Sequence, residues 1–242
     1  MALAEATACR ALVFDVFGTL VDWRGSIARE ARELLAPRGV SVDWQAFADA
    51  WRAQYQPAME EVRSGKIPFS KLDVLHRRNL EVVLKAFEIG GLDEAAKVHL
   101  NLAWHRLDAW PDVAPGLRRL RQRYRIAPCS NGNVSLMVDL ARRNALPWDA
   151  ILGAEFARDY KPKAAVYQSA ASAFDCEPAQ VLMVAAHSDD LAAAARAGLR
   201  TAHVARPDEK GPGRGETGPR GPVDVAARHL LDLADRLGAS ID

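Results

Sequence analysis

Short apolar runs that end at a polar or small residue recur along the chain and set its pattern. They are "RALVFD" at 10–15, "RIAPCS" at 125–130, "AILGA" at 150–154, "VLMVAA" at 181–186 and "RTAHVA" at 200–205. Runs of this length predict buried strands. Segments with helical spacing lie between the later runs, at 134–145, 164–174 and 190–198. Strands that alternate with helices predict an α/β fold: a doubly wound parallel (Rossmann-like) sheet with helices on both faces.

Residues 24–109 have a different pattern, with no convincing strand. Apolar residues at 44, 47, 51, 55 and 59 have the spacing of one helix face, and Pro57 is expected to kink or end that helix. Helical spacing continues through 69–87 and 92–107. We therefore expect a helical cap at 23–109, inserted after the first strand of a core formed by 1–22 and 110–242.

The C-terminal part of the chain predicts a loop followed by one more helix. The sequence contains no internal repeat. Residues 209–222 are rich in glycine and proline but have no strict three-residue period, which predicts a mobile loop rather than collagen. A final helix is expected at about 223–237.

Composition narrows the class of protein. Of 242 residues, 49% are hydrophobic, and 32 Lys and Arg against 31 Asp and Glu give a net charge of +1. That balance argues against general binding of nucleic acid or anionic membranes. Cys9, Cys129 and Cys176 are too few and too scattered for a zinc motif or a disulfide framework, and they fit a reducing cytoplasm. We see no export signal at the N-terminus and no apolar stretch near the ~20 residues that cross a membrane.

Polar residues follow three of the expected strands. Asp15 ends the first, Ser130 and Asn131 end the second, and residues 185–190 follow the fourth. Ligands of open parallel sheets bind at the carboxyl ends of the strands, so these residues are expected to meet in one crevice. A lone aspartate at such a point is also a common turn or capping residue.

Four motifs in order resemble the haloacid dehalogenase superfamily: "DVFGTL", "SNGN", "YKPKAAVY" and "VAAHSDDLAAAARAGLRTAHVARP". Within it the chain is most similar to the L-2-haloacid dehalogenases (type II). The resemblance covers nearly the whole chain, because the helical insert falls where that branch carries its cap. It implies hydrolysis of short 2-haloalkanoic acids to 2-hydroxy acids and halide, with Asp15 as the nucleophile that forms an aspartyl ester.

Phe17 distinguishes this chemistry from the phosphatase chemistry of the superfamily. The phosphatases carry a second aspartate two residues after the nucleophile as a proton donor, and a phenyl ring cannot donate a proton. A halide needs none, because it leaves as a stable anion. Ala185 stands where the phosphatases hold a metal-binding aspartate, and Asp189 could replace it only if turned inward. We therefore expect no catalytic metal and no cofactor; Phe17 could also simply pack behind the strand.

The resemblance assigns further catalytic residues around Asp15. Lys161 would balance its charge, with Lys163 as the weaker candidate. Asp190 would position Lys161 and the hydrolytic water or act as the base; alternatively it caps the helix that follows. Tyr167 is either a site residue or a core aromatic.

Substrate contacts are expected from both parts of the chain. Thr19 would hydrogen-bond near the nucleophile or form a local turn bond. Ser130 and Asn131 would hold the substrate carboxylate or merely form a turn. Arg52 in the cap would receive the halide, unless it is an exposed helix arginine.

Three more residues complete the expected site. Gln54 and Tyr55 would line the same cleft as Arg52. His187 stands where the branch often has asparagine, and it would donate to a halide or carboxylate, tune the water, or serve structure alone.

Two other functions remain open on the sequence alone. One is a magnesium-dependent phosphatase acting on a small phosphate ester, and the other is a protein that keeps the fold without turnover. For the dehalogenase, the expected partner is a small-molecule haloacid, with no nucleic acid and no membrane. The few scattered cysteines and the lack of an export signal predict a cytoplasmic protein, and the resemblance suggests a homodimer.

Overall fold

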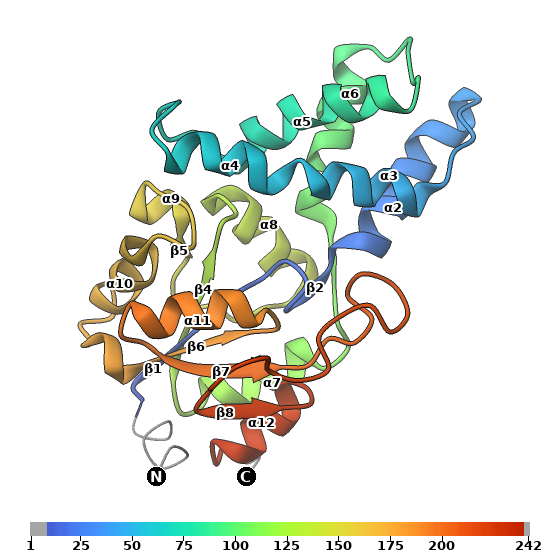
Figure 1. The fold of residues 1–242 in the computed structure, drawn as a ribbon. Helices are drawn as coiled ribbons and strands as arrows, with labels where there is room; N and C mark the ends of the chain where they lie inside the picture. Colours follow the sequence, from blue (N-terminus) through green and yellow to red (C-terminus); the bar gives the residue numbers. More distant parts are fainter. Residues whose placement is uncertain (1–8, 240–242) are drawn as a thin grey trace.

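The computed structural model describes residues 9–239, which form a six-stranded sheet with helices on both faces (Figure 1). All neighbouring strands are parallel, in the order β5-β4-β1-β6-β7-β8. The strands are β1 (Ala11–Phe14), β4 (Arg125–Ser130), β5 (Leu152–Gly153), β6 (Val181–Ala185), β7 (Arg200–Val204) and β8 (Val225–Ala227). The predicted doubly wound α/β core is confirmed, although β5 is shorter than the predicted strand.

Alternate side chains of β1 enter two separate hydrophobic cores. Ala11 and Val13 pack with α10 (Ala164–Ser172) and α11 (Ser188–Arg196). Leu12 and Phe14 point to the other face. The helices there are α7 (Val113–Arg121), α8 (Val134–Asn144) and α12 (Leu230–Arg236). Because both faces of β1 are covered, its sequence is continuously apolar up to Asp15.

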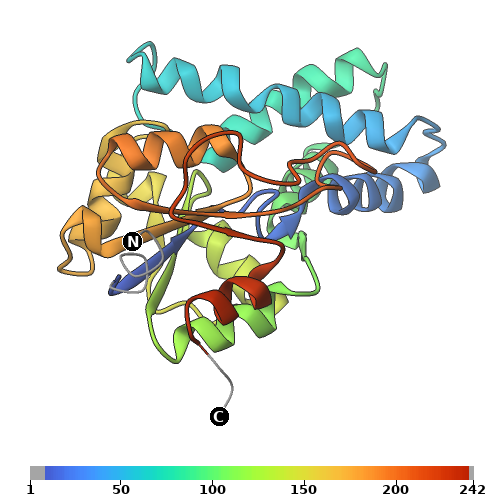
Figure 2. The same cartoon turned by 60° about the horizontal axis from the view of Figure 1, so that its bottom comes forward.

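Between β2 (Val21–Asp22) and β3 (Asp108–Ala109), which pair with each other antiparallel, the described chain is helical. The segments are α2 (Trp23–Leu35), η1 (Ala36–Arg38), α3 (Trp44–Ala53), α4 (Tyr55–Arg63), α5 (Leu72–Ala86), α6 (Glu94–Asn101) and η2 (Leu102–Arg106). Figures 1 and 2 show α3–α6 as a layer over one end of the sheet, away from the two termini. We keep the division into a core and a cap at 23–109 as our interpretation.

The helix expected across residue 57 is in fact two helices. Helix α3 ends at Ala53 and α4 begins at Tyr55, so the break precedes Pro57. A proline has no N–H to bond the carbonyl four residues earlier, which here is that of Ala53, and the helix therefore ends at that residue. Side chains on both sides of the break, Arg52 and Tyr55, face the cavity described below.

The predicted C-terminal helix is wrong in its first part. Residues 225–227 form β8, which extends the sheet beside β7, and α12 begins only at Leu230. Most of residues 209–222 lie outside regular helices and strands, as the glycine and proline content predicted. The N-terminal residues on which the absence of an export signal was argued lie mostly outside the described part of the chain. No described helix is long and apolar enough to cross a membrane.

Candidate active site

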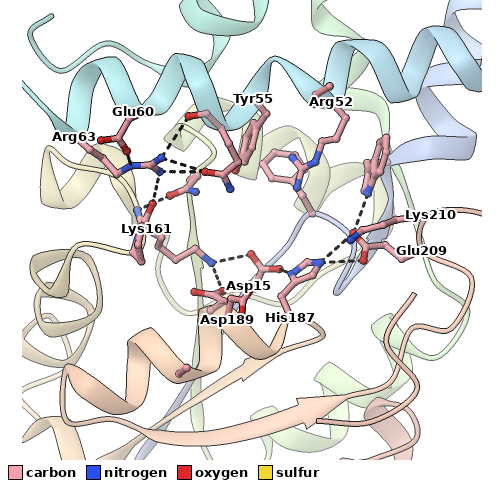
Figure 3. A pocket seen from close by; sticks show the side chains of 18 of the residues that line it. Asp15, Arg52, Tyr55, Glu60, Arg63, Lys161, His187, Asp189, Glu209 and Lys210 are labelled. Atoms are coloured by element: carbon pink, nitrogen blue, oxygen red, sulfur yellow. Dashed lines mark hydrogen bonds and ion pairs between the residues drawn. The ribbon is translucent and has the colours of Figure 1, made fainter. Parts of the chain in front are cut away.

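Three adjacent strands bring their carboxyl ends to the floor of a cavity of about 1120 Å³. β1 lies between β4 and β6, with Phe14 in register with Pro128 and Val184. The residues that follow these strands therefore meet, as predicted. Helices α3 and α4 form the roof, so that Arg52 and Tyr55 face Asp15 and His187 across the cavity (Figure 3).

Asp15 is buried, with 7% of its surface exposed, and both of its carboxylate oxygens are held. Oδ1 accepts a hydrogen bond from Lys161 Nζ at 2.8 Å. Oδ2 accepts from Thr19 Oγ1 at 2.7 Å. Burial opposes ionisation, but the charge of Lys161 and the hydrogen bond and charge of His187 hold the pKa of Asp15 well below its usual value. The group is therefore a carboxylate at neutral pH.

Lys161 links Asp15 to a second acid. Its Nζ lies 2.6 Å from Asp190 Oδ2, and its backbone N–H donates to Asn131 Oδ1 at 2.9 Å. Burial opposes the charged form, yet Asp15 and Asp190 raise the pKa of Lys161 well above the usual lysine value. The competing candidate, Lys163, is exposed at the mouth of the cavity.

Asp190 also accepts a hydrogen bond from the Tyr167 hydroxyl at 2.5 Å. This tyrosine, although fully buried, therefore belongs to the cluster formed by Asp15, Lys161 and Asp190. The alternative that Asp190 caps the helix is wrong. Helix α11 begins at Ser188, which places Asp190 inside its first turn. The N–H of Ser188 donates instead to Glu216, at 3.2 Å from both oxygens of that carboxylate.

Thr19 and Asn131 contact the cluster, whereas Ser130 does not reach the cavity. Thr19 Oγ1 accepts from the backbone N–H of Ala186 at 2.9 Å, which leaves its own proton for Asp15. Asn131 lines the cavity. Ser130 is buried away from the lining, and its Oγ accepts from the N–H of Gly132 at 3.1 Å, the turn bond that was the alternative interpretation.

Arg52 provides a cation in the roof above the acids. Its guanidinium carbon lies 4.0 Å from the centre of the Tyr55 ring, and Nη1 is buried without a hydrogen-bond partner among residues 9–239. Phe17 is 2% exposed and makes an edge contact with Tyr55. It therefore packs against its neighbours and also lines the cavity. Gln54 does not line the cavity, whereas Gln56, the second residue of α4, does.

Glu209 was missed by sequence analysis and joins the site through His187. His187 Nδ1 lies 3.1 Å from Asp15 Oδ2, and His187 Nε2 lies 3.0 Å from both oxygens of Glu209. Burial opposes protonation of His187, but hydrogen bonds to Asp15 and Glu209 raise its pKa to about 10. The only sequence signal for Glu209 is one acid in a loop rich in glycine and proline.

Two arginines that sequence analysis also missed hold backbone carbonyls beside the site. Arg63, at the end of α4, donates from Nη1 to the carbonyl of Lys161 at 2.8 Å (Figure 3). Arg206 donates from Nε to the carbonyl of Thr19 at 2.7 Å and pairs with both oxygens of Asp112 at 2.9 Å. The backbone beside two of the candidate catalytic groups is therefore fixed by buried guanidinium groups.

Asp189 and Cys129 point away from the acids. The side chain of Asp189 is 93% exposed and pairs with Arg220 at 3.3 Å, so it is not turned toward Asp15. Cys129 is buried, with its Sγ 3.8 Å from the carbonyl of Val166 on the α10 side of the sheet. Burial raises the pKa of this thiol to about 12, which fits a packing role.

A doubly wound parallel sheet with a buried, ionised aspartate after its central strand, paired to a lysine, places this protein among the Rossmann-like α/β proteins that have a carboxylate site at the carboxyl ends of their strands. More narrowly, the chain belongs to the haloacid dehalogenase-like hydrolase family, whose model matches residues 9–198. Two solved L-2-haloacid dehalogenases are 43% and 44% identical to it over nearly the whole chain, so it also belongs with the L-2-haloacid dehalogenases of that family.

Two solved structures and one curated sequence illustrate the relationship. The defluorinating L-2-haloacid dehalogenase Rha0230 is 43% identical, with a TM-score of 0.93 and 95% of each chain covered. The L-2-haloacid dehalogenase PA0810 is 44% identical, with a TM-score of 0.91 and coverage of 96% of this chain and 100% of that one. The (S)-2-haloacid dehalogenase 4A of Burkholderia cepacia is 28% identical over 200 residues, 81% of this chain and 83% of the relative.

Proposed function

We propose that this protein is a 2-haloacid dehalogenase that hydrolyses short 2-haloalkanoic acids, such as haloacetates and L-2-haloacids, to 2-hydroxy acids and halide. The observation that carries the proposal is the Asp15–Lys161 pair at 2.8 Å, a buried carboxylate whose cation is an ammonium group. The relatives named above are dehalogenases of this kind, which supports the same substrate class.

In the first step, an oxygen of Asp15 attacks the carbon that bears the halogen, from the side opposite the halide. The C–O bond forms as the carbon–halogen bond breaks, and the halide takes the bonding pair with it. Arg52 receives the halide, because its unpartnered Nη1 faces no other acceptor among the described residues. Asn131 and nearby backbone N–H groups hold the substrate carboxylate.

In the second step, water adds to the carboxyl carbon of the Asp15 ester. Asp190 takes the proton of that water, and the departing alcohol oxygen takes a proton from Lys161, which lies 2.6 Å from Asp190 and can be reprotonated by it. The hydroxy acid leaves with an oxygen of Asp15, and the new carboxylate keeps the oxygen from water. Tyr167 fixes Asp190 for this exchange.

The magnesium-dependent phosphatase is less well supported by the residues present. Phe17 offers no proton to a leaving alcohol, and Ala185 offers no ligand. The exposed side chain of Asp189 does not replace it. No contact among residues 9–239 favours that function or a protein without turnover, so we put the dehalogenase forward alone.

Halide release from chloro-, bromo- and fluoroacetate and from (S)-2-chloropropionate tests the proposal. We expect halide release from the chloro and bromo substrates that is unaffected by chelator and absent in Asp15→Asn. Hydrolysis of an aryl phosphate that chelator abolishes, without halide release, would show that the phosphatase function is the correct one.

We further propose that the enzyme works in the cytoplasm as a homodimer. Its cysteines are only three, all buried, and they are scattered along the chain, which suits a reducing compartment. Light scattering of the purified protein gives the molar mass; a value near 26.4 kDa would mean a monomer and contradict the dimer.

A further inference from the structure

We propose that Glu209 holds His187 as an imidazolium ion whose Nδ1–H stabilises the negative charge that forms on Asp15 Oδ2 during ester hydrolysis. His187 is then a catalytic residue of the second step, and Glu209 is the residue that positions it. This inference rests on the proposed dehalogenase function, because it concerns the ester that Asp15 forms there.

The hydrogen-bond pattern requires the charged form of His187. Nδ1 lies 3.1 Å from an oxygen of Asp15, and Nε2 lies 3.0 Å from both oxygens of Glu209. An ionised carboxylate only accepts hydrogen bonds, and a neutral imidazole has a single N–H. One of the two ring nitrogens would therefore face a carboxylate with a lone pair, unless both nitrogens carry protons.

Glu209 is part of a built site and not a chance neighbour from a loop. It is 2% exposed, and Trp23 Nε1 donates to its Oε1 at 3.1 Å. Gly18 has a left-handed backbone with φ of 86°, and a side chain at that position would collide with the Glu209 carboxylate. A buried acid is stable only when it is paired, and the partner that balances its charge here is His187.

The two oxygens of Asp15 have different donors, which separates their roles. Oδ2 accepts from Thr19 Oγ1 at 2.7 Å and from His187, whereas Oδ1 accepts from Lys161 Nζ. Oδ1 retains more free lone-pair density and forms the ester bond, and Oδ2 remains the carbonyl oxygen. When water adds to the carboxyl carbon, the π electron pair moves onto Oδ2, where the two donors already point. It returns when the Cγ–Oδ1 bond breaks.

Alkylation changes the charges around His187. In the resting enzyme the ring lies between two carboxylates, but Asp15 is neutral once it is an ester, so Glu209 becomes the main group that keeps the ring protonated. Arg52 and His203 also act on this pair, the first through Glu209 and the second as a neighbour of His187. Loss of the Glu209 charge should therefore slow ester hydrolysis far more than ester formation.

Glu209→Gln tests this difference with chloroacetate under rapid mixing. We expect a burst of halide within a fewfold of the parent rate, followed by ester hydrolysis that is slower by about 10²- to 10³-fold, the typical effect of losing one such donor. The ester should accumulate and appear as added mass on the peptide that contains Asp15. If the burst and the hydrolysis slow by the same factor, or if neither changes, the inference is wrong.

Two further variants test whether Glu209 positions His187 or only supports the local structure. Asp208→Asn changes the exposed acid next to Glu209 in the same loop and should leave both steps unchanged. Glu209→Gln should add no further loss in a His187→Asn background, because its effect passes through the ring. An equal loss in both backgrounds would mean that Glu209 acts on structure alone.

The pH dependence of ester hydrolysis tests independently whether His187 acts as a donor or as a base. A donor is lost on deprotonation, so the rate should fall as pH rises, and in Glu209→Gln this fall should move to lower pH. A rate that rises with pH would make His187 a base and overturn the proposal. If the parent enzyme releases no halide from any haloacid, the dehalogenase function itself fails, an outcome distinct from all of these.

Discussion

Lys161 Nζ lies 2.8 Å from Asp15 Oδ1, and this buried contact joins the residue after the first strand to a residue 146 positions later in the chain. The same ammonium group contacts Asp190 at 2.6 Å. Two acids close to one another repel unless a cation lies between them, so the lysine offsets the repulsion between this pair.

Lys161→Met should abolish most of the activity. Without the ammonium group, the pKa of Asp15 rises and the ester oxygen loses its proton donor, so we expect halide release to fall by at least about 10²-fold. The matched control is Lys163→Met, which removes the exposed lysine two residues away and should stay within about twofold of the parent. Equal losses in the two variants would contradict the role given to Lys161.

Arg52→Lys should impair halide departure although the charge is kept. An ammonium group has neither the planar shape nor the reach of the guanidinium that stacks on Tyr55, with 4.0 Å between its carbon and the ring centre. We expect the rate of the halide burst to fall by about 10²-fold. Arg214→Lys, at the mouth of the same cavity, is the control. An unchanged burst in Arg52→Lys would exclude a direct contact with the halide.

Arg63→Lys should loosen the contact between α4 and the backbone of Lys161. Its Nη1 donates to the carbonyl of that residue at 2.8 Å, while its Nε pairs with Glu60 at 2.8 Å. A lysine cannot make both contacts, and a small displacement of Lys161 can lower kcat by about tenfold to a hundredfold. Arg78→Lys, which changes an exposed pair with Glu61, should not affect kcat. Equal kcat values for Arg63→Lys and the parent would rule out this positioning role.

His105 should make stability depend on pH. Its ring lies 2.7 Å from Asp139 and 3.1 Å from Asp73, and these acids raise its pKa although burial opposes the charge. A histidine whose pKa is higher in the folded state than in the unfolded state stabilises the fold at pH values below its unfolded pKa of about 6.5. This contribution is lost as pH rises through the folded pKa. The free energy of unfolding lost in His105→Gln, from urea titration, should therefore be larger at pH 6 than at pH 9.

The control for that measurement is a histidine with the opposite shift. His76 is fully buried, and burial lowers its pKa to about 3. Protonation of the unfolded state below about pH 6.5 then favours unfolding, so His76→Gln should lose less stability at pH 6 than at pH 9. The same trend in both variants would show that the pH effect does not come from these rings.

The central strands and the acids beside them could be predicted from the sequence because both are local signals. An apolar run buried on both faces identifies β1, and the position of Asp15 follows from where that run ends. β8 was missed because three residues are too few to outweigh the helical spacing around them. The start of α11 was placed two residues late, because the residue that accepts its first N–H, Glu216, is distant in the chain.

The supporting contacts of the site could not be predicted, since each joins segments far apart in the sequence. Glu209 reaches His187 from a loop whose composition indicates only turns. Arg63 reaches a carbonyl 98 positions away, and a backbone acceptor leaves no mark in the sequence. Ser130 fitted the motif but uses its hydroxyl for a local turn, which pattern alone does not distinguish from substrate binding.

A single turnover in H₂¹⁸O, with enzyme in excess over chloroacetate, tests most directly whether Asp15 forms an ester. In the proposed route the product hydroxyl comes from Asp15, and water replaces that oxygen in the enzyme. The prediction is therefore unlabelled glycolate and one heavy oxygen in the peptide that contains Asp15, both read by mass spectrometry. Labelled glycolate from the first turnover, with no label in that peptide, would contradict the covalent route.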